Sequence, residues 1–180
     1  MSGDGRDELL VVRCQLGERD AFPQLVRVWH APLWRYLRGM VGSHHLADDL
    51  AQEAWVAVVR GLPRLRQPDR FAPWLFTIAR RTVTDHLRQS YKGFETAVEE
   101  AEVGIGDDSL NGVLTTLEIE AGLARLPPLE REVLILFHLQ DLSLAACAEV
   151  LDVPPGTVKS RLHRARRMLR DILTERGHEA

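Results

Sequence analysis

The stretch that decides the fold is SLAACAEVLDVPPGTVKSRLHRARRMLR, which runs from Ser143 to Arg170. Ser143 can cap a first helix, because a serine hydroxyl accepts a hydrogen bond from the unpaired N–H groups of a first turn. Asp152 and Val153 then form a turn. A second helix is predicted to begin near Pro155, because proline suits the first helical position, where its missing N–H would be unpaired anyway. The stretch therefore predicts two helices around a tight turn.

The predicted second helix has one apolar face and a strongly basic remainder. The residues expected to face inward repeat at helical spacing and are Val158, Leu162, Ala165 and Leu169. Two neighbouring outward stripes hold Ser160, Arg161, Arg164 and Arg167, and Lys159, His163, Arg166 and Arg170. No acid alternates with these cations before Asp171, as it would on an ordinary solvated helix. A helix that reads duplex DNA needs this division, since its side chains reach base edges while neighbouring cations bind phosphates.

Composition favours two small helical domains. The chain has 180 residues, an apolar fraction of 45% and a formal net charge of -3, and that charge is strongly segregated. No Lys or Arg lies between Lys92 and Arg125, whereas that interval holds eight acids, so the flanking parts are net basic. The acids are Glu95, Glu99, Glu100, Glu102, Asp107, Asp108, Glu118 and Glu120. We expect domains over residues 1–92 and 114–180, joined by a flexible acidic linker over residues 93–113.

Other site types are disfavoured. Cys14 and Cys147 lie in apolar helical patterns, so they form neither a disulfide framework nor a metal knuckle, and we expect both in the core. A metal site from His44, His45, Asp48 and Asp49 is disfavoured because adjacent helical residues point apart, and we expect no metal or cofactor. Signal and membrane-spanning segments are not evident, which predicts a cytoplasmic protein without direct membrane insertion.

Periodicity predicts four helices before the linker. The first covers about 7–16, with Leu9, Val12 and Leu16 on its apolar side and Leu10 beside them. The second follows Asp20 as its N-cap, is kinked or split at Pro32, and is closed by Gly42 and Ser43. The third covers about 45–60 and the fourth about 70–89. After the linker, helices over about 114–126 and 129–139 lead into the opening stretch.

The third and fourth helices each have a distinctive outer face. The third turns Leu46, Leu50, Ala54 and Val58 inward and presents a polar stripe of Asp49, Gln52, Glu53, Val56 and Arg60. That stripe alone is compatible with a simple solvated face. The fourth has Phe71, Trp74, Leu75, Ile78 and Leu87 as core contacts, and its outer side carries Thr77, Arg80, Arg81, Thr84, His86 and Arg88. Cations and hydroxyls beside aromatic residues suit single-stranded nucleic acid.

These segments together resemble the extracytoplasmic-function (ECF) sigma factors of bacterial RNA polymerase. DAFPQLVRVWHAPLWRYL, ADDLAQEAW and RFAPWLFTIARRTVTDHLR are similar to the family's region 2 in order and spacing. LARLPPLEREVLILFHLQDLS and the opening stretch are similar to its region 4. The resemblance implies an all-α protein that catalyses nothing itself, binds core polymerase, directs it to promoters and promotes their opening.

The resemblance also implies roles for particular residues. Core polymerase would be bound at its β′ clamp helices, through Asp49, Gln52 and Glu53, and at its β flap. The minus-10 element would be bound by Arg64, Arg66, Arg70, Thr77, Arg80, Arg81, Thr84 and Arg88. The minus-35 element would be bound by Thr157, Lys159, Ser160, Arg161, His163, Arg164 and Arg167. An anti-sigma factor is a further expected partner.

The chain departs from the usual family pattern at two positions of the opening stretch. Ala146 stands where an acid commonly completes a capping box, so Ser143 must cap alone. Asp152 stands where glycine is usual in the turn, although aspartate tolerates a left-handed backbone better than most residues.

Two other functions remain open from the sequence. A stand-alone helix-turn-helix regulator would dimerise on a palindrome without polymerase, but it leaves the N-terminal half unexplained. An enzyme acting on nucleic acid would need a metal near Asp48, Asp49 and Glu53, and no inward-facing cluster of acids is evident in the pattern.

Overall fold

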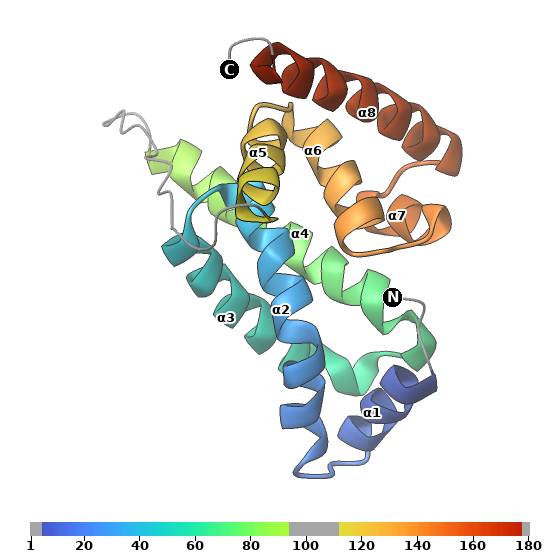
Figure 1. Ribbon diagram of the computed structural model, residues 1–180. Helices are drawn as coiled ribbons and strands as arrows, with labels where there is room; N and C mark the ends of the chain where they lie inside the picture. Colours follow the sequence, from blue (N-terminus) through green and yellow to red (C-terminus); the bar gives the residue numbers. More distant parts are fainter. Residues whose placement is uncertain (1–4, 94–111, 178–180) are drawn as a thin grey trace.

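The computed structural model describes residues 5–93 and 112–177, which form helices and turns without strands (Figure 1). The N-terminal half contributes α1 (Gly5–Gln15), α2 (Ala21–Val41), α3 (His44–Gly61) and α4 (Phe71–Gly93), with 3₁₀ turns η1 (Leu62–Arg64) and η2 (Pro68–Arg70) between α3 and α4. The C-terminal half contributes α5 (Gly112–Ala124), α6 (Pro128–Leu134), π-helical turn η3 (Ile135–Leu139), α7 (Leu144–Leu151) and α8 (Pro155–Gly177). The predicted all-α class is confirmed. Most of the predicted linker lies outside the described residues.

The centre of the N-terminal half is α2, which packs against α1, α3 and α4. Its buried side carries Leu25, Trp29, Leu33, Tyr36 and Leu37. The prediction that Pro32 splits this helix is wrong, because α2 is continuous from Ala21 to Val41. Buried side chains before and after Pro32 pack on the same core, and this packing outweighs the roughly 3 kcal/mol that an interior proline costs. The helix ends as predicted at Gly42, whose φ of 74° suits glycine.

Three local predictions in this half are wrong. Asp20 precedes α2, but its side chain makes no capping hydrogen bond, because its own backbone is already helical at φ −89° and ψ −9°. In α1 Leu10 is buried as expected, but its buried neighbour is Val11, and Leu9 and Leu16, which were predicted to face inward, are exposed. A helix this short has too few apolar residues to fix which side faces inward. Leu87 is also exposed, because it lies beyond Val83, the last buried apolar residue among the described side chains of α4.

The C-terminal half is arranged around α8, the long helix along the upper edge of Figure 1. Helices α5, α6 and α7 all pack against it. The approach of α5 to α8 is close at Gly122, where an added Cβ would lie 2.9 Å from Leu169 Cδ1. These three short helices thus hold one face of α8 and leave the opposite face to solvent.

The helix-turn-helix forms as its sequence predicts. The hydroxyl oxygen of Ser143 accepts a hydrogen bond of 3.1 Å from the Ala146 N–H at the start of α7. Asp152 ends α7 in the left-handed region at φ 53° and ψ 51°. Helix α8 begins at Pro155, and its predicted inward residues Val158, Leu162 and Ala165 are buried. Local cap and turn chemistry therefore places α8 where its basic side is exposed.

The two halves pack against each other. α4 contacts α7, while α2 contacts α5, α6 and η3. One cluster of buried apolar side chains includes residues of both halves. At the boundary, Gly39 of α2 lies so close to η3 that an added Cβ would be 2.6 Å from Ile135 Cδ1. This packing determines which basic residues of α4 are covered.

Candidate nucleic-acid interface

The outer face of α8 carries the predicted duplex-binding residues. Lys159, Ser160, His163, Arg164 and Arg167 are exposed, and Thr157 and Arg161 are half-buried. Thr157, Ser160, Arg161 and Arg164 line one hollow of about 310 Å³, so four of the seven predicted side chains share a single concave surface. Within the described residues, Lys159, Arg161 and Arg167 form no ion pair. These cations are therefore available to an anionic partner.

Arg164 differs from the other cations of this face because its side chain forms an ion pair with a buried residue of α6. Its guanidinium pairs with Glu130 of α6, whose side chain is only 4% exposed. A buried carboxylate favours a charged partner strongly, so the pair restrains the direction of the Arg164 side chain. A preformed orientation lowers the entropy lost when an arginine binds a base or a phosphate.

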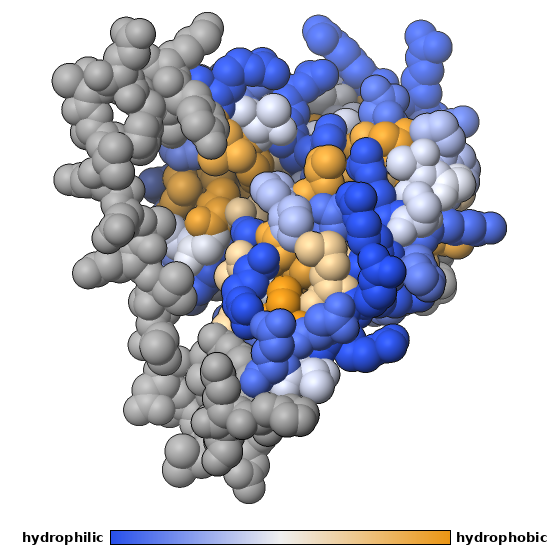
Figure 2. Space-filling model, turned by 90° about the horizontal axis from the view of Figure 1, so that it is seen from above, coloured by the Kyte–Doolittle hydropathy of each residue, from blue (hydrophilic) through white to orange (hydrophobic). Residues whose placement is uncertain are grey.

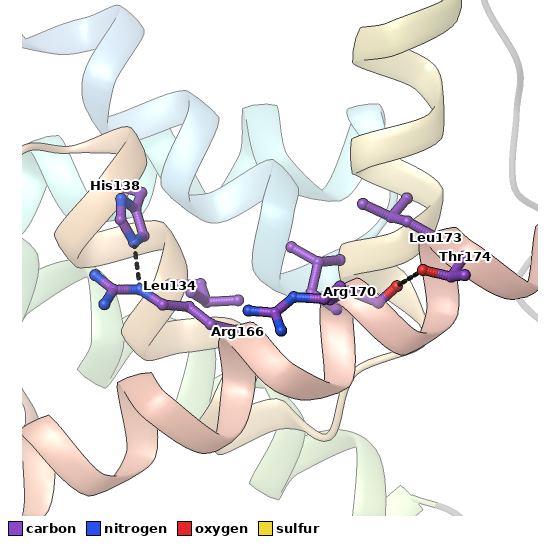
Figure 3. Close-up of a pocket in the computed structure, with 7 residues that line it drawn as sticks. Leu134, His138, Arg166, Arg170, Leu173 and Thr174 are labelled. Atoms are coloured by element: carbon purple, nitrogen blue, oxygen red, sulfur yellow. Dashed lines mark hydrogen bonds between the residues drawn. The ribbon is translucent and has the colours of Figure 1, made fainter. Parts of the chain in front are cut away.

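A second surface of α8 faces a groove of about 460 Å³ that also involves α6 and η3 (Figure 3). Leu134, Leu169 and Leu173 supply its apolar lining. In Figure 2 apolar surface is visible between hydrophilic areas on the face seen from above. This groove belongs to the C-terminal half and is separate from the hollow that Arg161 and Arg164 line.

Arg166 belongs to the groove rather than to the duplex-binding hollow. Its Nε donates to His138 Nε2 at 3.1 Å, and its guanidinium carbon lies 5.6 Å from the centre of the Phe137 ring. Partial burial and the neighbouring Arg166 charge lower the pKa of His138, which keeps that imidazole neutral. The outward basic stripe predicted to include Arg166 is therefore divided between two surfaces.

On α4 and the turns before it, most of the predicted single-strand-binding residues are exposed. The exposed residues are Arg64, Arg66, Arg70, Thr77, Arg81, Thr84 and Arg88. The hydroxyls of Thr77 and Thr84 donate to the carbonyl oxygens of Pro73 and Arg80 at 2.8 Å. Arg88 pairs with Asp85 at 3.5 Å along the same helix. Hydroxyls and cations thus follow one side of α4.

Arg80 and Arg70 are engaged by the other half of the protein. Arg80 Nε donates to Glu132 Oε1 of α6 at 3.1 Å, and its side chain is 34% exposed. The prediction that Arg80 lies openly on the outer face of α4 is therefore wrong in this packed arrangement. Arg70 pairs with Glu149 of α7. Both contacts bring a carboxylate to a residue expected to bind DNA.

Tyr36 completes the contact at Glu132. Its hydroxyl, on a fully buried side chain of α2, donates to Glu132 Oε1 at 2.7 Å. Burial and the Glu132 carboxylate raise the pKa of Tyr36 well above its usual value, so the phenol remains a hydrogen-bond donor. Glu132 thus accepts hydrogen bonds from a neutral and a charged donor of the N-terminal half.

The burial of Glu130 and Glu132 was not predicted from the sequence. A signal exists. Glu130 precedes Val133 and Leu134 by three and four residues, and Glu132 precedes Ile135 and Leu136 at the same spacing. Residues at these spacings share a helix face, so both acids are expected on buried sides, where each requires a cation.

The polar stripe of α3 is exposed as predicted. Asp49, Gln52 and Glu53 face solvent beside Val56, which is 49% exposed, while Leu50, Ala54 and Val58 are buried. Ser43 caps this helix by accepting a hydrogen bond of 3.3 Å from the Leu46 N–H. None of the three polar side chains forms an ion pair within the described chain. A folded, capped helix therefore presents two carboxylates and an amide to a partner.

The acids and histidines near the start of α3 make other contacts. Trp34 Nε1 donates to Asp48 Oδ1 at 2.7 Å, and the Trp34 ring lies 5.2 Å from that of His44. In residues 5–93 and 112–177 no three His, Cys, Asp or Glu side chains are grouped as a metal site requires. The same residues include no helix that is both long and apolar enough to cross a membrane.

In comparisons with known proteins, both halves of the chain match known protein families. Residues 25–92 match Sigma-70 region 2, and residues 116–169 match Sigma-70, region 4. The chain is 31% identical over 172 residues to the ECF RNA polymerase sigma factor SigW of Bacillus subtilis, which covers 88% of this chain and 92% of that protein. It is 34% identical over 157 residues to SigM of Mycobacterium tuberculosis, which covers 87% of this chain and 79% of that protein.

Solved structures show the same fold. The structure of CnrH in complex with the cytosolic domain of CnrY has a TM-score of 0.71 and 26% identity, covering 94% of this chain and 97% of that one. The sigma factor RpoE of Bartonella quintana, solved with the anti-sigma factor NepR, has a TM-score of 0.74 and 23% identity, covering 85% of this chain and 96% of that one. From these matches and the helix-turn-helix geometry, we conclude that the chain belongs to the ECF sigma factors, which bind core RNA polymerase and direct transcription initiation at promoters.

Proposed function

We propose that this sigma factor binds its partners through three separate surfaces. The exposed stripe of α3 binds core polymerase, η1 to α4 binds the opened minus-10 element, and the outer face of α8 binds the minus-35 element as duplex. In this assignment residues 1–92 form region 2, residues 93–113 the linker and residues 114–180 region 4. The observation that carries the proposal is the outer face of α8. Arg161 and Arg164 line a concave surface there, Lys159 and Arg167 are exposed on the same helix, and the other side of the helix is buried.

The minus-35 element meets the N-terminal half of α8. The exposed side of such a helix fits the major groove of duplex DNA while its opposite side stays packed on the protein. Side chains of its first turns then reach the base edges. In this proposal Arg161 and Arg164, which line the hollow, contact base edges. Lys159 and Arg167 contact phosphates. Thr157, Ser160 and His163 complete the surface with shorter hydrogen-bonding groups.

The minus-10 element meets the turns before α4 and the outer side of that helix. Arg64, Arg66 and Arg70 approach the strand before the helix, and Thr77, Arg80, Arg81, Thr84 and Arg88 follow along it. Cations that follow a backbone path bind single strands through phosphates, and hydroxyls contribute hydrogen bonds to unstacked bases. Trp74 is packed against the core, so it is not assigned a stacking role.

Asp49, Gln52 and Glu53 are assigned to the β′ clamp helices of core polymerase. Acidic and amide side chains on a rigid helix suit a basic partner, because they give electrostatic attraction and a defined register. The β flap is assigned to region 4. A protein with these partners would act in the cytoplasm, where polymerase and promoters are found. An anti-sigma factor is proposed as a regulator, as one binds RpoE of Bartonella quintana.

The other functions are less well supported. An enzyme would need its acids gathered around a substrate or metal, but Asp48 is engaged by Trp34, and Glu130 and Glu132 are paired with arginines. A stand-alone regulator would leave the exposed α3 stripe without a partner.

A binding experiment with core polymerase tests whether polymerase and DNA bind to separate surfaces. Fluorescently labelled protein is titrated with core enzyme, and Asp49→Ala and Glu53→Ala should each weaken binding about tenfold or more. Arg161→Ala should leave core binding unchanged and weaken binding to minus-35 duplex. Asp171→Asn, an exposed acid of α8, is the matched charge control. Equal core affinity of all four variants would remove α3 from the polymerase interface.

A further inference from the structure

Residues 62–70, which we call the joining segment, connect α3 to α4 and carry three of the cations assigned to the minus-10 element, Arg64, Arg66 and Arg70. Between η1 and η2 the backbone is extended, with φ −68° and ψ 110° at Leu65 and φ −123° and ψ 91° at Gln67. An extended segment without a partner strand has few hydrogen bonds of its own. Contacts from other elements must therefore fix its direction.

Helix α1 supplies such contacts, because it packs against both η1 and η2 (Figure 1). Its last residue is Gln15, whose Nε2 donates to the carbonyl oxygen of Leu62 at 3.0 Å and to that of Leu65 at 2.7 Å. The Leu62 carbonyl also accepts the Leu65 N–H at 3.1 Å, which is the bond that closes η1. One side-chain amide thus uses both of its hydrogens to join the end of η1 to the extended residue that follows it.

The two ends of the joining segment are fixed by packing instead. Gly61, just before it, lies so close to α4 that an added Cβ would be 2.8 Å from Trp74 Cζ2. Leu62 is 4% exposed, and Phe71, just after the segment, is 1% exposed. The middle of the segment lies on the surface, and its exposed arginines, at positions 64 and 66, form no ion pair within the described residues. Gln15 therefore acts on the part of the segment that packing leaves open.

From these contacts, and resting on the proposed minus-10 surface, we propose that Gln15 is a positioning residue for recognition of the minus-10 strand. It holds the carbonyl groups of Leu62 and Leu65, so the backbone that carries Arg64 and Arg66 is fixed before DNA arrives. A loop already in its binding conformation loses less entropy when it binds. A fixed backbone also favours the base sequence that matches it, so the Gln15 amide should contribute to sequence discrimination.

A purely structural role for Gln15 leads to a different expectation. Loss of a structural contact would weaken binding to every oligonucleotide alike, whereas loss of positioning should weaken binding to the cognate sequence most. An N–H donor should also be what matters at this position. A side chain of the same length without a donor should therefore fail, and a different side chain with N–H donors should succeed.

The test uses the complete chain bound to core polymerase and two fluorescent single-stranded oligonucleotides. One carries the minus-10 sequence shared by the mapped start sites, and the other carries that sequence scrambled. Gln15→Met keeps the length of the side chain and its helix propensity but removes the donor. We expect it to lower the ratio of cognate to scrambled affinity at least about threefold, as loss of a hydrogen bond can do. Hydrogen–deuterium exchange of the free chain should become faster in residues 62–67 and stay unchanged in α2.

A donor-retaining variant and a matched control complete the experiment. Gln15→Arg restores N–H donors, and its added charge strengthens binding to both oligonucleotides, so the affinity ratio should stay within about twofold of that of the unaltered protein. Gln24→Met makes the same glutamine-to-methionine change on α2, at a side chain without a hydrogen bond in residues 5–93 and 112–177, and should change neither measurement. An unchanged ratio in Gln15→Met, an equal fall in Gln15→Arg, or a fall without faster exchange in residues 62–67 would overturn the inference.

Arg64→Ala and Arg66→Ala test the assignment on which the inference rests. If either weakens oligonucleotide binding while Gln15→Met leaves the affinity ratio unchanged, the inference alone is wrong. If neither weakens binding, the joining segment does not bind the minus-10 strand, and the assignment and the inference both fail.

Discussion

The guanidinium of Arg164 on the exposed face of α8 is paired with the buried carboxylate of Glu130 on α6. One residue of the proposed DNA-reading surface is therefore also part of the support beneath it. Removal of this arginine should affect both the fold and the recognition of DNA.

Arg164→Ala leaves the Glu130 carboxylate buried without a cation. We expect the free energy of unfolding to fall by about 1–3 kcal/mol, the usual cost of an unsatisfied buried polar group. Urea unfolding followed by circular dichroism measures the change. Arg167→Ala removes an exposed cation of the same helix without an ion pair, and it should change stability by less than about 0.5 kcal/mol. Equal stability of the two variants would contradict a supporting role for Glu130.

Lys159 and Arg161 should differ in how they bind duplex DNA. Lys159→Ala should weaken binding to all duplexes and reduce the slope of log affinity against log salt by about 1, because one phosphate contact is lost. Arg161→Ala should reduce specificity for the minus-35 sequence by about 1–3 kcal/mol. Fluorescence anisotropy with cognate and scrambled duplexes at several salt concentrations distinguishes them. An equal loss on both duplexes for Arg161→Ala would exclude base reading by this residue.

Ser143 is the N-terminal cap of α7, because its hydroxyl accepts the Ala146 N–H at 3.1 Å. Ser143→Ala should lower the free energy of unfolding by about 1 kcal/mol, as loss of a helix cap does. Ser143→Asn provides the control, since asparagine can accept the same hydrogen bond. Thermal and urea denaturation measure both variants. A loss in Ser143→Asn as large as in Ser143→Ala would show that the cap is not the cause.

Burial raises the pKa of the Cys147 thiol to about 11. The folded state thus favours the neutral thiol, and its stabilising effect is lost as pH rises from about 9 towards 11. Unfolding experiments from pH 7 to 10.5 should show a smaller alkaline loss for Cys147→Ala than for the unaltered protein. Tyr36 contributes a loss of the same sign in both proteins, so their difference isolates Cys147.

The reactivity of the two cysteine thiols provides a second test of the burial of Cys147. Cys147 is completely buried, whereas Cys14 is only partly buried. Iodoacetamide at pH 8 should therefore modify Cys14 much faster, and mass spectrometry of the peptides gives both rates. Equal rates would contradict the burial of Cys147.

The helix-turn-helix could be predicted closely because its determinants are local. Ser143, Asp152 and Pro155 each act on the backbone within a few residues, and their cap, left-handed turn and helix start are all present. The inward face of α8 also follows from spacing alone, since three of its four predicted residues are completely or almost completely buried.

The boundary between the halves could not be predicted in the same way. The contact of Tyr36 with Glu132 joins residues 96 positions apart, and no local rule pairs them. The sequence indicated that α4 is basic, but the burial of part of Arg80 depends on α6 from the other half. The side of α1 was also misassigned, because Leu9, Leu10, Val11 and Val12 are consecutive apolar residues and α2 decides which of them are buried.

The central claim is that the protein gives core polymerase its promoter specificity, and reconstituted transcription tests it most directly. Core RNA polymerase free of other sigma factors is combined with the protein and a library of genomic fragments, and the 5′ ends of the transcripts are sequenced. We predict defined start sites that share minus-10 and minus-35 sequences, require the protein, and are lost with Asp49→Ala combined with Glu53→Ala. The absence of any protein-dependent start site, with a core enzyme that responds to another sigma factor, would contradict the account.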